Sequence, residues 1–204
     1  MATAGIEKLF RSARLIYRAV EDDQEDKNFM YKIQSDVAAL ASSDSDLLKP
    51  MTTKEANSHH AYVSSRTLLG VIICLPNPER TSIGSLYLTA PKPGAEHHRN
   101  SYISIDIIAD YQRKGYGSEA IEWALNWGFK IAGLHRIGIE AFSYNEGARQ
   151  LYERLGFVYE GCKRELLWFN GDWHDYLSWS MLEHEWRALI EKKSLANAKE
   201  VKKE

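Results

Sequence analysis

The chain has 204 residues, of which 44% are apolar and 26% are charged, and its formal net charge is −2. This composition is typical of a globular protein with one sizeable core, and the length favours a single domain. The nearly balanced charge gives no general attraction for nucleic acid, and no segment approaches the roughly 18 unbroken apolar residues that a membrane span requires. These properties argue against nucleic acid or a membrane as a partner.

The ends of the chain and its cysteines set the expected boundaries and compartment. Residues 1–13 lack the apolar block of a secretory signal and predict a flexible arm, and residues 194–204 predict a basic, polar tail. A single domain is expected to span residues 14–193. Cys74 and Cys162 have no CxxC partner, so their spacing predicts neither a zinc site nor a disulfide framework and fits a reducing, cytoplasmic location.

The first part of the chain predicts a strand, a helix and a long irregular segment. Residues 14–20 are expected to form the strand, and Asp26 is the expected cap of the helix, whose apolar positions recur at helical spacing from Phe29 to Leu40. Residues 42–65 mix turn-forming residues with short helical pieces. Because so long an irregular segment in a compact domain is often functional, we expect substrate contacts there.

From residue 66 onwards, predicted strands and helices alternate. Strands are expected over residues 67–75, 81–89, 101–109 and 135–143, helices over about 117–133 and 145–156, then a hairpin turning at Asn170-Gly171 and a final helix. Alternation of this kind favours one mixed sheet with helices on both faces, so the expected fold class is α/β, of the α+β mixed-sheet kind.

An anion site is predicted between the third of these strands and the helix that follows it. A helix N-terminus leaves amide hydrogens without partners and carries a partial positive charge, so a phosphate group can accept several hydrogen bonds there. Gly115 and Gly117 permit close approach of the backbone. Arg113 and Lys114 add full positive charge beside the same amides.

Of three other interpretations of this loop, one fails and two stay open. A Walker A loop requires Lys and Ser or Thr after its last glycine, but Ser118 and Glu119 follow Gly117, so that motif fails. A G-x-G-x-x-A dinucleotide pattern survives through Ala120, although it lies past the middle of the chain instead of in a first βαβ unit. A simple strand-to-helix turn that favours glycine is the third.

The loop resembles the phosphate motif Q/R-x-x-G-x-G/A of the GNAT superfamily of acyl-CoA-dependent N-acyltransferases. A second stretch resembles the family in the expected order and separation, since a helix and a strand lie between the two. The matching residues are Gln112, Gly115 and Gly117, then Asn145, Ala148, Leu151, Tyr152, Gly156 and Phe157. The resemblance covers about residues 66–182, more loosely 14–40, and the closing hairpin and helix are most similar to the RimJ/RimL-type branch. It implies a central mixed, mostly antiparallel sheet flanked by helices.

The resemblance also implies how the co-substrate, acetyl-CoA, is bound. Main-chain groups of Ile107 and Ile108 would bind the pantetheine arm, and Asn145 would contact it from the other side. Gln112 belongs to the phosphate motif itself. The pyrophosphate would be held by consecutive backbone amides: Arg113, Lys114, Gly115, Tyr116, Gly117 and Ser118.

For catalysis, the resemblance directs the Tyr152 hydroxyl at the thioester sulfur. A thiol has a reference pKa near 8.5 and a phenol one near 10, so the phenol can deliver a proton to the departing thiolate. A lysine-like amine, with a pKa of about 10.4, is mostly protonated at pH 7, so a general base is expected. Asp106 is the nearest carboxylate in the sequence, and Glu140 competes with it. Amides near Asp106 would form an oxyanion hole.

Other aromatic and histidine side chains are candidates for a substrate groove. His59 and His60 lie in the irregular segment, and Trp168, Trp173 and Tyr176 belong to the final hairpin. Each is also explained as an ordinary surface or core residue. His97 and His98 have no third ligand at the spacing of a metal site, so we expect no metal.

The expected function is transfer of an acetyl group from acetyl-CoA directly to a primary amine of a small molecule, a protein N-terminus or a side chain. We expect a monomer or homodimer. Two alternatives stay open: a catalytically silent acyl-CoA-binding sensor or scaffold, and a nucleotide-binding oxidoreductase that uses the G-x-G-x-x-A pattern.

Overall fold

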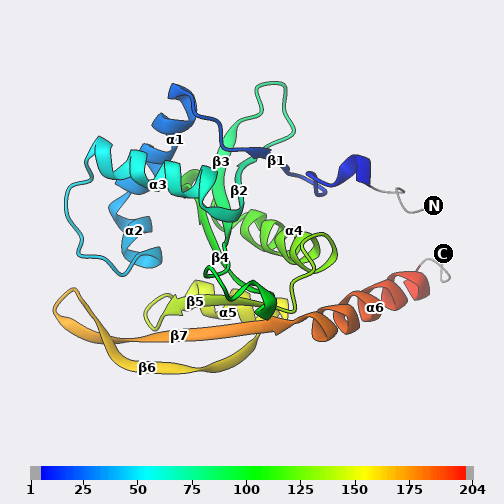
Figure 1. Cartoon of the computed structure of the whole chain (residues 1–204). Coiled ribbons are helices and arrows are strands. Elements are labelled where there is room, and N and C mark those ends of the chain that lie inside the picture. Colours follow the sequence, from blue (N-terminus) through cyan, green and yellow to red (C-terminus); the bar gives the residue numbers. More distant parts are fainter. Residues whose placement is uncertain (1–5, 201–204) are drawn as a thin grey trace.

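A computed structural model describes residues 6–200, with side chains described as far as residue 196. Its strands form one seven-stranded sheet in the order β1-β2-β3-β4-β5-β7-β6, in which only β4 and β5 are parallel (Figure 1). The strands are β1 (Ile16–Ala19), β2 (Thr67–Cys74), β3 (Ser82–Thr89), β4 (Asn100–Ile107), β5 (Arg136–Phe142), β6 (Val158–Phe169) and β7 (Asp172–Leu182). The helices are α1 (Gln24–Ser35), α2 (Val37–Ser43), α3 (Thr53–Ser65), α4 (Tyr116–Lys130), α5 (Glu146–Leu155) and α6 (Glu183–Glu200), with short 3-10 helices η1 (Ile6–Lys8), η2 (Glu96–His98) and η3 (Ala109–Tyr111). The expected mixed, mostly antiparallel sheet flanked by helices is confirmed.

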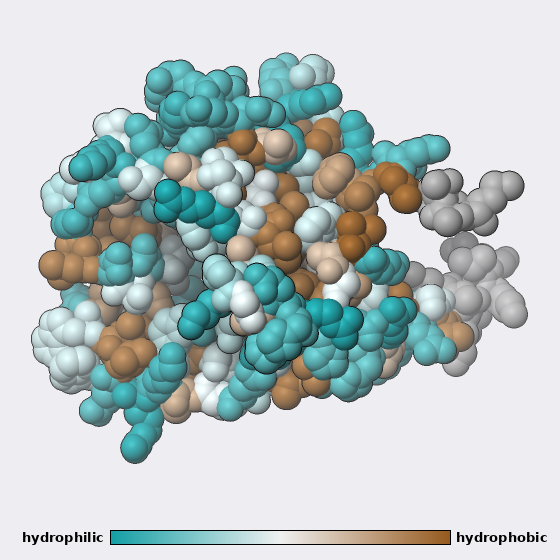
Figure 2. Space-filling view, in the orientation of Figure 1, coloured by the Kyte–Doolittle hydropathy of each residue, from teal (hydrophilic) through white to brown (hydrophobic). Residues whose placement is uncertain are grey.

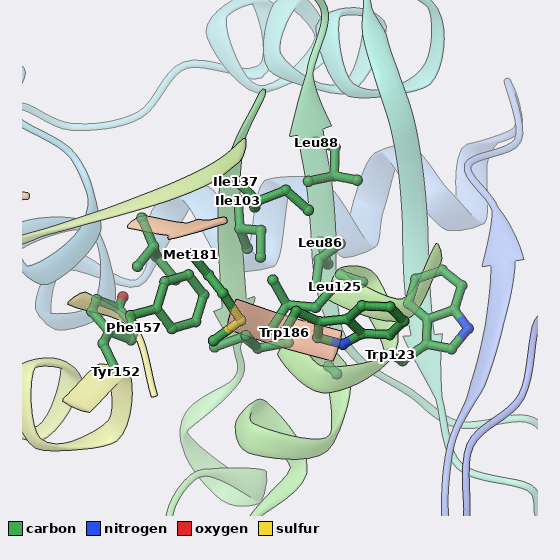
Figure 3. Packing of buried hydrophobic residues seen from close by; sticks show 14 of the residues in the cluster. Leu86, Leu88, Ile103, Trp123, Leu125, Ile137, Tyr152, Phe157, Met181 and Trp186 are labelled. Atoms are coloured by element: carbon green, nitrogen blue, oxygen red, sulfur yellow. The ribbon is translucent and has the colours of Figure 1, made fainter. Parts of the chain in front are cut away.

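The sheet is covered on both faces, which explains the nearly continuous apolar run of β2. Val71 and Ile73 belong to the main core beneath α4, whereas Ile72 and Cys74 belong to a smaller cluster with α1 and α3. Neighbouring residues of a strand point to opposite faces, so both faces of β2 must be apolar. Figure 3 shows the main core extending from Tyr152 and Phe157 at one end to Trp123, beside β1, at the other.

The segment that the sequence predicts as irregular contains a regular helix. Thr52 accepts a hydrogen bond from the Glu55 amide, and the Glu55 side chain accepts one from the Thr52 amide, which is a complete capping box for α3. The single helix predicted around Phe29–Leu40 is divided at Asp36, which ends α1 and caps α2. The expectation of a long irregular segment was therefore wrong for residues 53–65.

The cap of α1 also differs from the prediction. Asp23 is the N-cap and accepts from the Asp26 amide at 2.8 Å. Asp26 instead is 1% exposed and binds Arg18, whose Nη1 and Nη2 donate to its carboxylate at 2.7 and 2.5 Å. The Glu21 amide donates to the same carboxylate at 2.8 Å. Asp26 thus ties β1 to α1 because it is buried against a guanidinium.

The terminal segments make contacts where they are described. The Trp123 indole donates to the Leu9 carbonyl at 2.7 Å, and Tyr17 stacks on Trp123 with ring centroids 3.7 Å apart. At the other end, α6 continues through Glu200. The predictions for residues 1–5 and 201–204 lie outside the described residues.

The surface carries its apolar residues in separate patches. Figure 2 shows brown residues interrupted by teal ones over the whole visible face. Within residues 6–200, none of the helices combines the length and the apolar character that crossing a membrane would require.

Removing the Asp26 carboxylate tests the tie between β1 and α1. We expect Asp26→Ala to lower the free energy of unfolding by about 3 kcal/mol or more, because it leaves the Arg18 guanidinium without its buried partner. Urea unfolding measures the change. Asp22→Ala is the matched control, because Asp22 pairs with Lys27 but its side chain is 86% exposed. If the two variants unfold alike, the buried pair does not hold α1.

Candidate functional site

The loop between β4 and α4 presents backbone amides that have no acceptor. Arg113 and Gly115 adopt left-handed backbone conformations, with φ of 58° and 82°. The amides from Arg113 to Ser118 donate to no acceptor within residues 6–200. A Cβ atom built on Gly117 would meet no atom within 4 Å. The first turn of α4 therefore has free donors and open space beside them, which is what an anion requires.

Side chains of the same loop stabilise its path. Gln112 Nε2 donates to the Ile107 carbonyl at 2.8 Å, and Lys114 Nζ donates to the Asp110 carbonyl at 2.7 Å. The Arg113 side chain is exposed. The glutamine of the motif thus closes the turn, and Arg113 is the loop cation whose side chain reaches into solvent.

β4 and β5 are paired only at one end. Their parallel register covers Asn100–Tyr102 and Arg136–Gly138. Beyond these residues β4 continues to Ile107 and β5 to Phe142 without pairing to each other, and we call this region the β4–β5 opening. One edge of each strand is unpaired there, so its main-chain groups are available to a ligand.

Ile107 and Ile108, the predicted pantetheine contacts, differ in which main-chain groups are free to bind a ligand. Ile108 donates its amide to the Ile83 carbonyl at 3.0 Å, and its carbonyl accepts from Tyr111 at 2.9 Å. Antiparallel neighbours alternate between hydrogen-bonded and non-bonded pairs, so Ile107 directs its main-chain groups away from β3 and towards the opening. The Ile107 carbonyl already accepts from Gln112. The Ile107 amide is the donor that remains.

Tyr152 lies at the other side of the opening. It is 7% exposed and lies beside Phe157 at one end of the main core (Figure 3). Its ring packs edge-on against Trp179, with centroids 5.7 Å apart. Its hydroxyl makes a single long hydrogen bond of 3.5 Å, to the Glu140 carbonyl of β5. Burial raises the pKa of Tyr152, and the charge of Asp106 raises it further, so the phenol keeps its proton.

Asp106 is the carboxylate that the fold brings towards Tyr152. Burial raises the pKa of Asp106 to about 6, with Asp44 adding to the rise and the Ser43 hydroxyl opposing it. Ile108, two residues on, packs in the cluster with α1 and α3. Asp106 therefore faces the α1–α3 side of the sheet, next to the end of α2, and is ionised above about pH 6.

Glu140, the competing carboxylate, has a partner. Tyr176 donates its hydroxyl to Glu140 Oε2 at 2.5 Å. Burial raises the pKa of Tyr176, and the bonded carboxylate raises it further, so the phenol stays the donor. The bond occupies one oxygen of Glu140. Within the described residues, no tyrosine hydroxyl donates to the Asp106 carboxylate.

The residues after β5 hold the end of α2, a feature that the sequence did not indicate. The Tyr144 hydroxyl donates to the Ala41 carbonyl at 2.6 Å, and Asn145 Nδ2 donates to the Ser42 carbonyl at 3.1 Å. Asn145 Oδ1 also caps α5 by accepting from the Ala148 amide at 3.1 Å. Asn145 keeps one N–H and one oxygen lone pair free for a ligand.

The other candidates occupy different surroundings. His60 is 3% exposed, and its Nε2 lies 2.9 Å from the Glu21 carbonyl, which is a core contact. His59 packs edge-on against Tyr87, and burial lowers its pKa. Trp168 and Trp173 pack against each other on the hairpin and are 62% and 53% exposed. Within the described side chains, no three His, Cys, Asp or Glu residues converge as metal ligands.

The chain is similar to known N-acetyltransferases. A family model described as "Acetyltransferase (GNAT) family" matches residues 13–157. The uncharacterized N-acetyltransferase YoaA of Bacillus subtilis is 35% identical over 89 residues, which are 44% of this chain and 50% of that protein. The putative ribosomal N-acetyltransferase YdaF of the same organism is 34% identical over 89 residues, 44% of this chain and 49% of that protein. The chain thus spans about half the length of the curated relatives it matches.

Solved structures share most of the fold. A spermidine N-acetyltransferase from Vibrio cholerae, in complex with CoA and spermine, superposes with a TM-score of 0.71 at 23% identity, covering 86% of this chain and 99% of that chain. Identity this low supports the fold alone. The family model covers more than half of the chain, including both the phosphate loop and the Tyr152 helix, so the chain belongs to the acetyltransferase (GNAT) family.

Proposed function

We propose that this protein is an N-acetyltransferase that uses acetyl-CoA as co-substrate. The observation that carries the proposal is the run of free amides from Arg113 to Ser118 directly beside the β4–β5 opening. A diphosphate at the amides and a pantetheine arm along the opening would bring the thioester between Tyr152 and Asp106. Ile107 and Asn145 supply donors along that path, whereas the Ile108 amide is already bonded to the Ile83 carbonyl.

The proposed reaction is direct transfer. The amine nitrogen attacks the thioester carbonyl carbon, and the Ile107 amide donates to the carbonyl oxygen and stabilises the charge that develops there. The carbon–sulfur bond then breaks, and Tyr152 protonates the departing thiolate. Asp106 accepts the proton that the amine loses, directly or through water. The products are an amide and CoA with a free thiol, and no covalent enzyme intermediate forms.

The acceptor is proposed to be a primary amine of a small molecule or a protein. The carboxylates of Asp106 and Asp44 would favour a cationic amine near the end of α2. The similar proteins include a putative ribosomal N-acetyltransferase and a spermidine N-acetyltransferase, which supports the RimJ/RimL-type branch as part of this proposal. Cys74 and Cys162 are free thiols, which supports a reducing, cytoplasmic location.

A side chain at Gly117 should block the co-substrate without harming the fold. Because a Cβ there meets no atom and the position is helical, Gly117→Leu should keep or slightly raise the melting temperature. Wild type with CoA at about a hundred times its Kd should be stabilised by about 2.7 kcal/mol, and the variant should lose this stabilisation.

Gly147→Leu is the matched control, since Gly147 lies in the first turn of α5 and its Cβ would meet only Asn145 Oδ1 at 3.9 Å. It should keep the CoA response. Stabilisation of wild type by NAD(H) in place of CoA would contradict the proposal and favour the dinucleotide interpretation.

Removing the Tyr152 hydroxyl should slow the chemical step. Its one hydrogen bond is long, so Tyr152→Phe should fold normally and bind CoA with unchanged Kd, while kcat falls about a hundred- to ten-thousand-fold. Tyr159→Phe is the control, because Tyr159 also packs edge-on against Trp179 but is 51% exposed. A protein that binds CoA but has no measurable turnover in wild type would instead be the silent sensor.

Asp106→Asn should separate activity from stability. With a pKa of about 6, Asp106 acts as a base above that pH, so the variant should lose the rise of kcat/KM near pH 6. Burial of the ionised carboxylate weakens the fold above pH 6 and not below pH 4. The variant should therefore be more stable than wild type at pH 8, on the order of 2 kcal/mol, with the gain vanishing towards pH 4. Glu140→Gln tests the competing candidate for the base. If Glu140→Gln abolishes the rise of kcat/KM near pH 6 and Asp106→Asn does not, Glu140 is the base.

A further inference from the structure

The segment before β1 contacts the phosphate loop through one arginine. Arg14 Nη1 donates to the Lys114 carbonyl at 3.0 Å, and Arg14 Nε donates to Glu119 Oε2 at 2.8 Å. The guanidinium also lies over the Tyr116 ring, 4.8 Å from its centroid. These contacts join residues about a hundred positions apart, and Arg14 lies outside the phosphate motif.

The bond to Lys114 fixes the direction of the next amide. In a trans peptide the C=O and the N–H point in opposite directions, so a donor that holds the Lys114 carbonyl leaves the Gly115 amide pointing away from Arg14. Gly115 is in the left-handed region with φ of 82°, where glycine has little intrinsic preference of its own. Arg14 therefore supplies a restraint that this peptide otherwise lacks.

Glu119 places a negative charge in the same turn of α4. Its side chain is 14% exposed, and its carboxylate accepts from the Ser12 hydroxyl at 2.6 Å and from the Arg14 amide at 2.6 Å, besides the guanidinium. These bonds hold the pKa of Glu119 below its usual value despite burial, so it is ionised at neutral pH. An unpaired carboxylate here would repel a diphosphate, and Arg14 is the cation that offsets it.

We propose that Arg14 is a positioning residue of the phosphate loop: it orients the Lys114–Gly115 peptide and neutralises Glu119, and so strengthens binding of the diphosphate of acyl-CoA. The inference rests on the proposed function. The segment itself is anchored elsewhere, through the Trp123 bond to the Leu9 carbonyl and the stacking of Tyr17 on Trp123. Loss of the Arg14 side chain therefore leaves the backbone of the segment in place.

Four variants test this role by calorimetric titration with CoA and with 3′-dephospho-CoA, which both carry the diphosphate. Arg14→Ala should weaken both ligands equally, by about ten- to a hundred-fold, while kcat at saturating acetyl-CoA and KM for the amine change less than about threefold. Glu119→Gln in the Arg14→Ala background should recover part of the loss, since it removes the unpaired charge. Arg14→Lys should recover part as well, because one ammonium can hold the carbonyl or the carboxylate. Arg11→Ala, which removes an exposed cation from the same segment, should leave both Kd values within about twofold.

Three results would overturn the inference. An Arg14→Ala protein with a lower melting temperature but unchanged Kd values would make the residue purely structural. A loss confined to CoA, absent with 3′-dephospho-CoA, would mean that Arg14 binds the 3′-phosphate instead. A wild-type protein that binds neither ligand would refute the proposed function itself, and with it the role of Arg14. Equal losses with no recovery on Glu119→Gln would keep the orienting role and overturn the neutralising one.

Discussion

The site depends on backbone amides that the fold leaves without acceptors. A helix that begins directly after a turn has free N–H groups in its first turn, and here no side chain caps them. The turn requires left-handed conformations at Arg113 and Gly115, and the first of these is unusual for a residue with a side chain. Bonds from Gln112 and Lys114 to nearby carbonyls hold that path, so the donors are arranged before any ligand arrives. Preorganised donors of this kind bind an anion without a large ordering cost.

The opening between β4 and β5 also leaves backbone groups without hydrogen-bond partners, in this case along the edges of two strands. The only parallel pair of the sheet is also its shortest register, and where it ends the two strands expose unpaired edges within the protein. Unpaired backbone groups are normally a liability, so a protein that keeps them needs something to occupy the space. Tyr152 and Asp106 lie on the two sides of this opening. They are close enough for the charge of Asp106 to raise the pKa of Tyr152.

The sequence predicted those features whose residues lie close together along the chain. Strand and helix periods were strong, so the fold class followed from the sequence. The phosphate loop and the Tyr152 helix are each contiguous, so both could be located in the sequence as candidate parts of a site. The capping box at Thr52 and Glu55 was equally local and could have been recognised, because the T-x-x-E spacing is a known helix start. Asp23 and Asp26 could not be told apart, since Arg18 decides between them through a long-range pair. The role of Arg14 depends in the same way on contacts that only the folded chain makes.

Asn145 supports both Tyr152, the proposed acid, and the surroundings of Asp106, the proposed base. Asn145 Oδ1 caps α5, and two turns later that helix presents Tyr152 to the opening. The Nδ2 group of the same side chain donates to the Ser42 carbonyl at the end of α2. Ser43, the last residue of α2, lowers the pKa of Asp106, and Asp44, its C-cap, raises it. A displacement of Asn145 would therefore move the phenol and alter the surroundings of the carboxylate together. Apart from any contact with pantetheine, Asn145 therefore has a structural role, because its two hydrogen bonds fix both sides of the proposed acid–base pair.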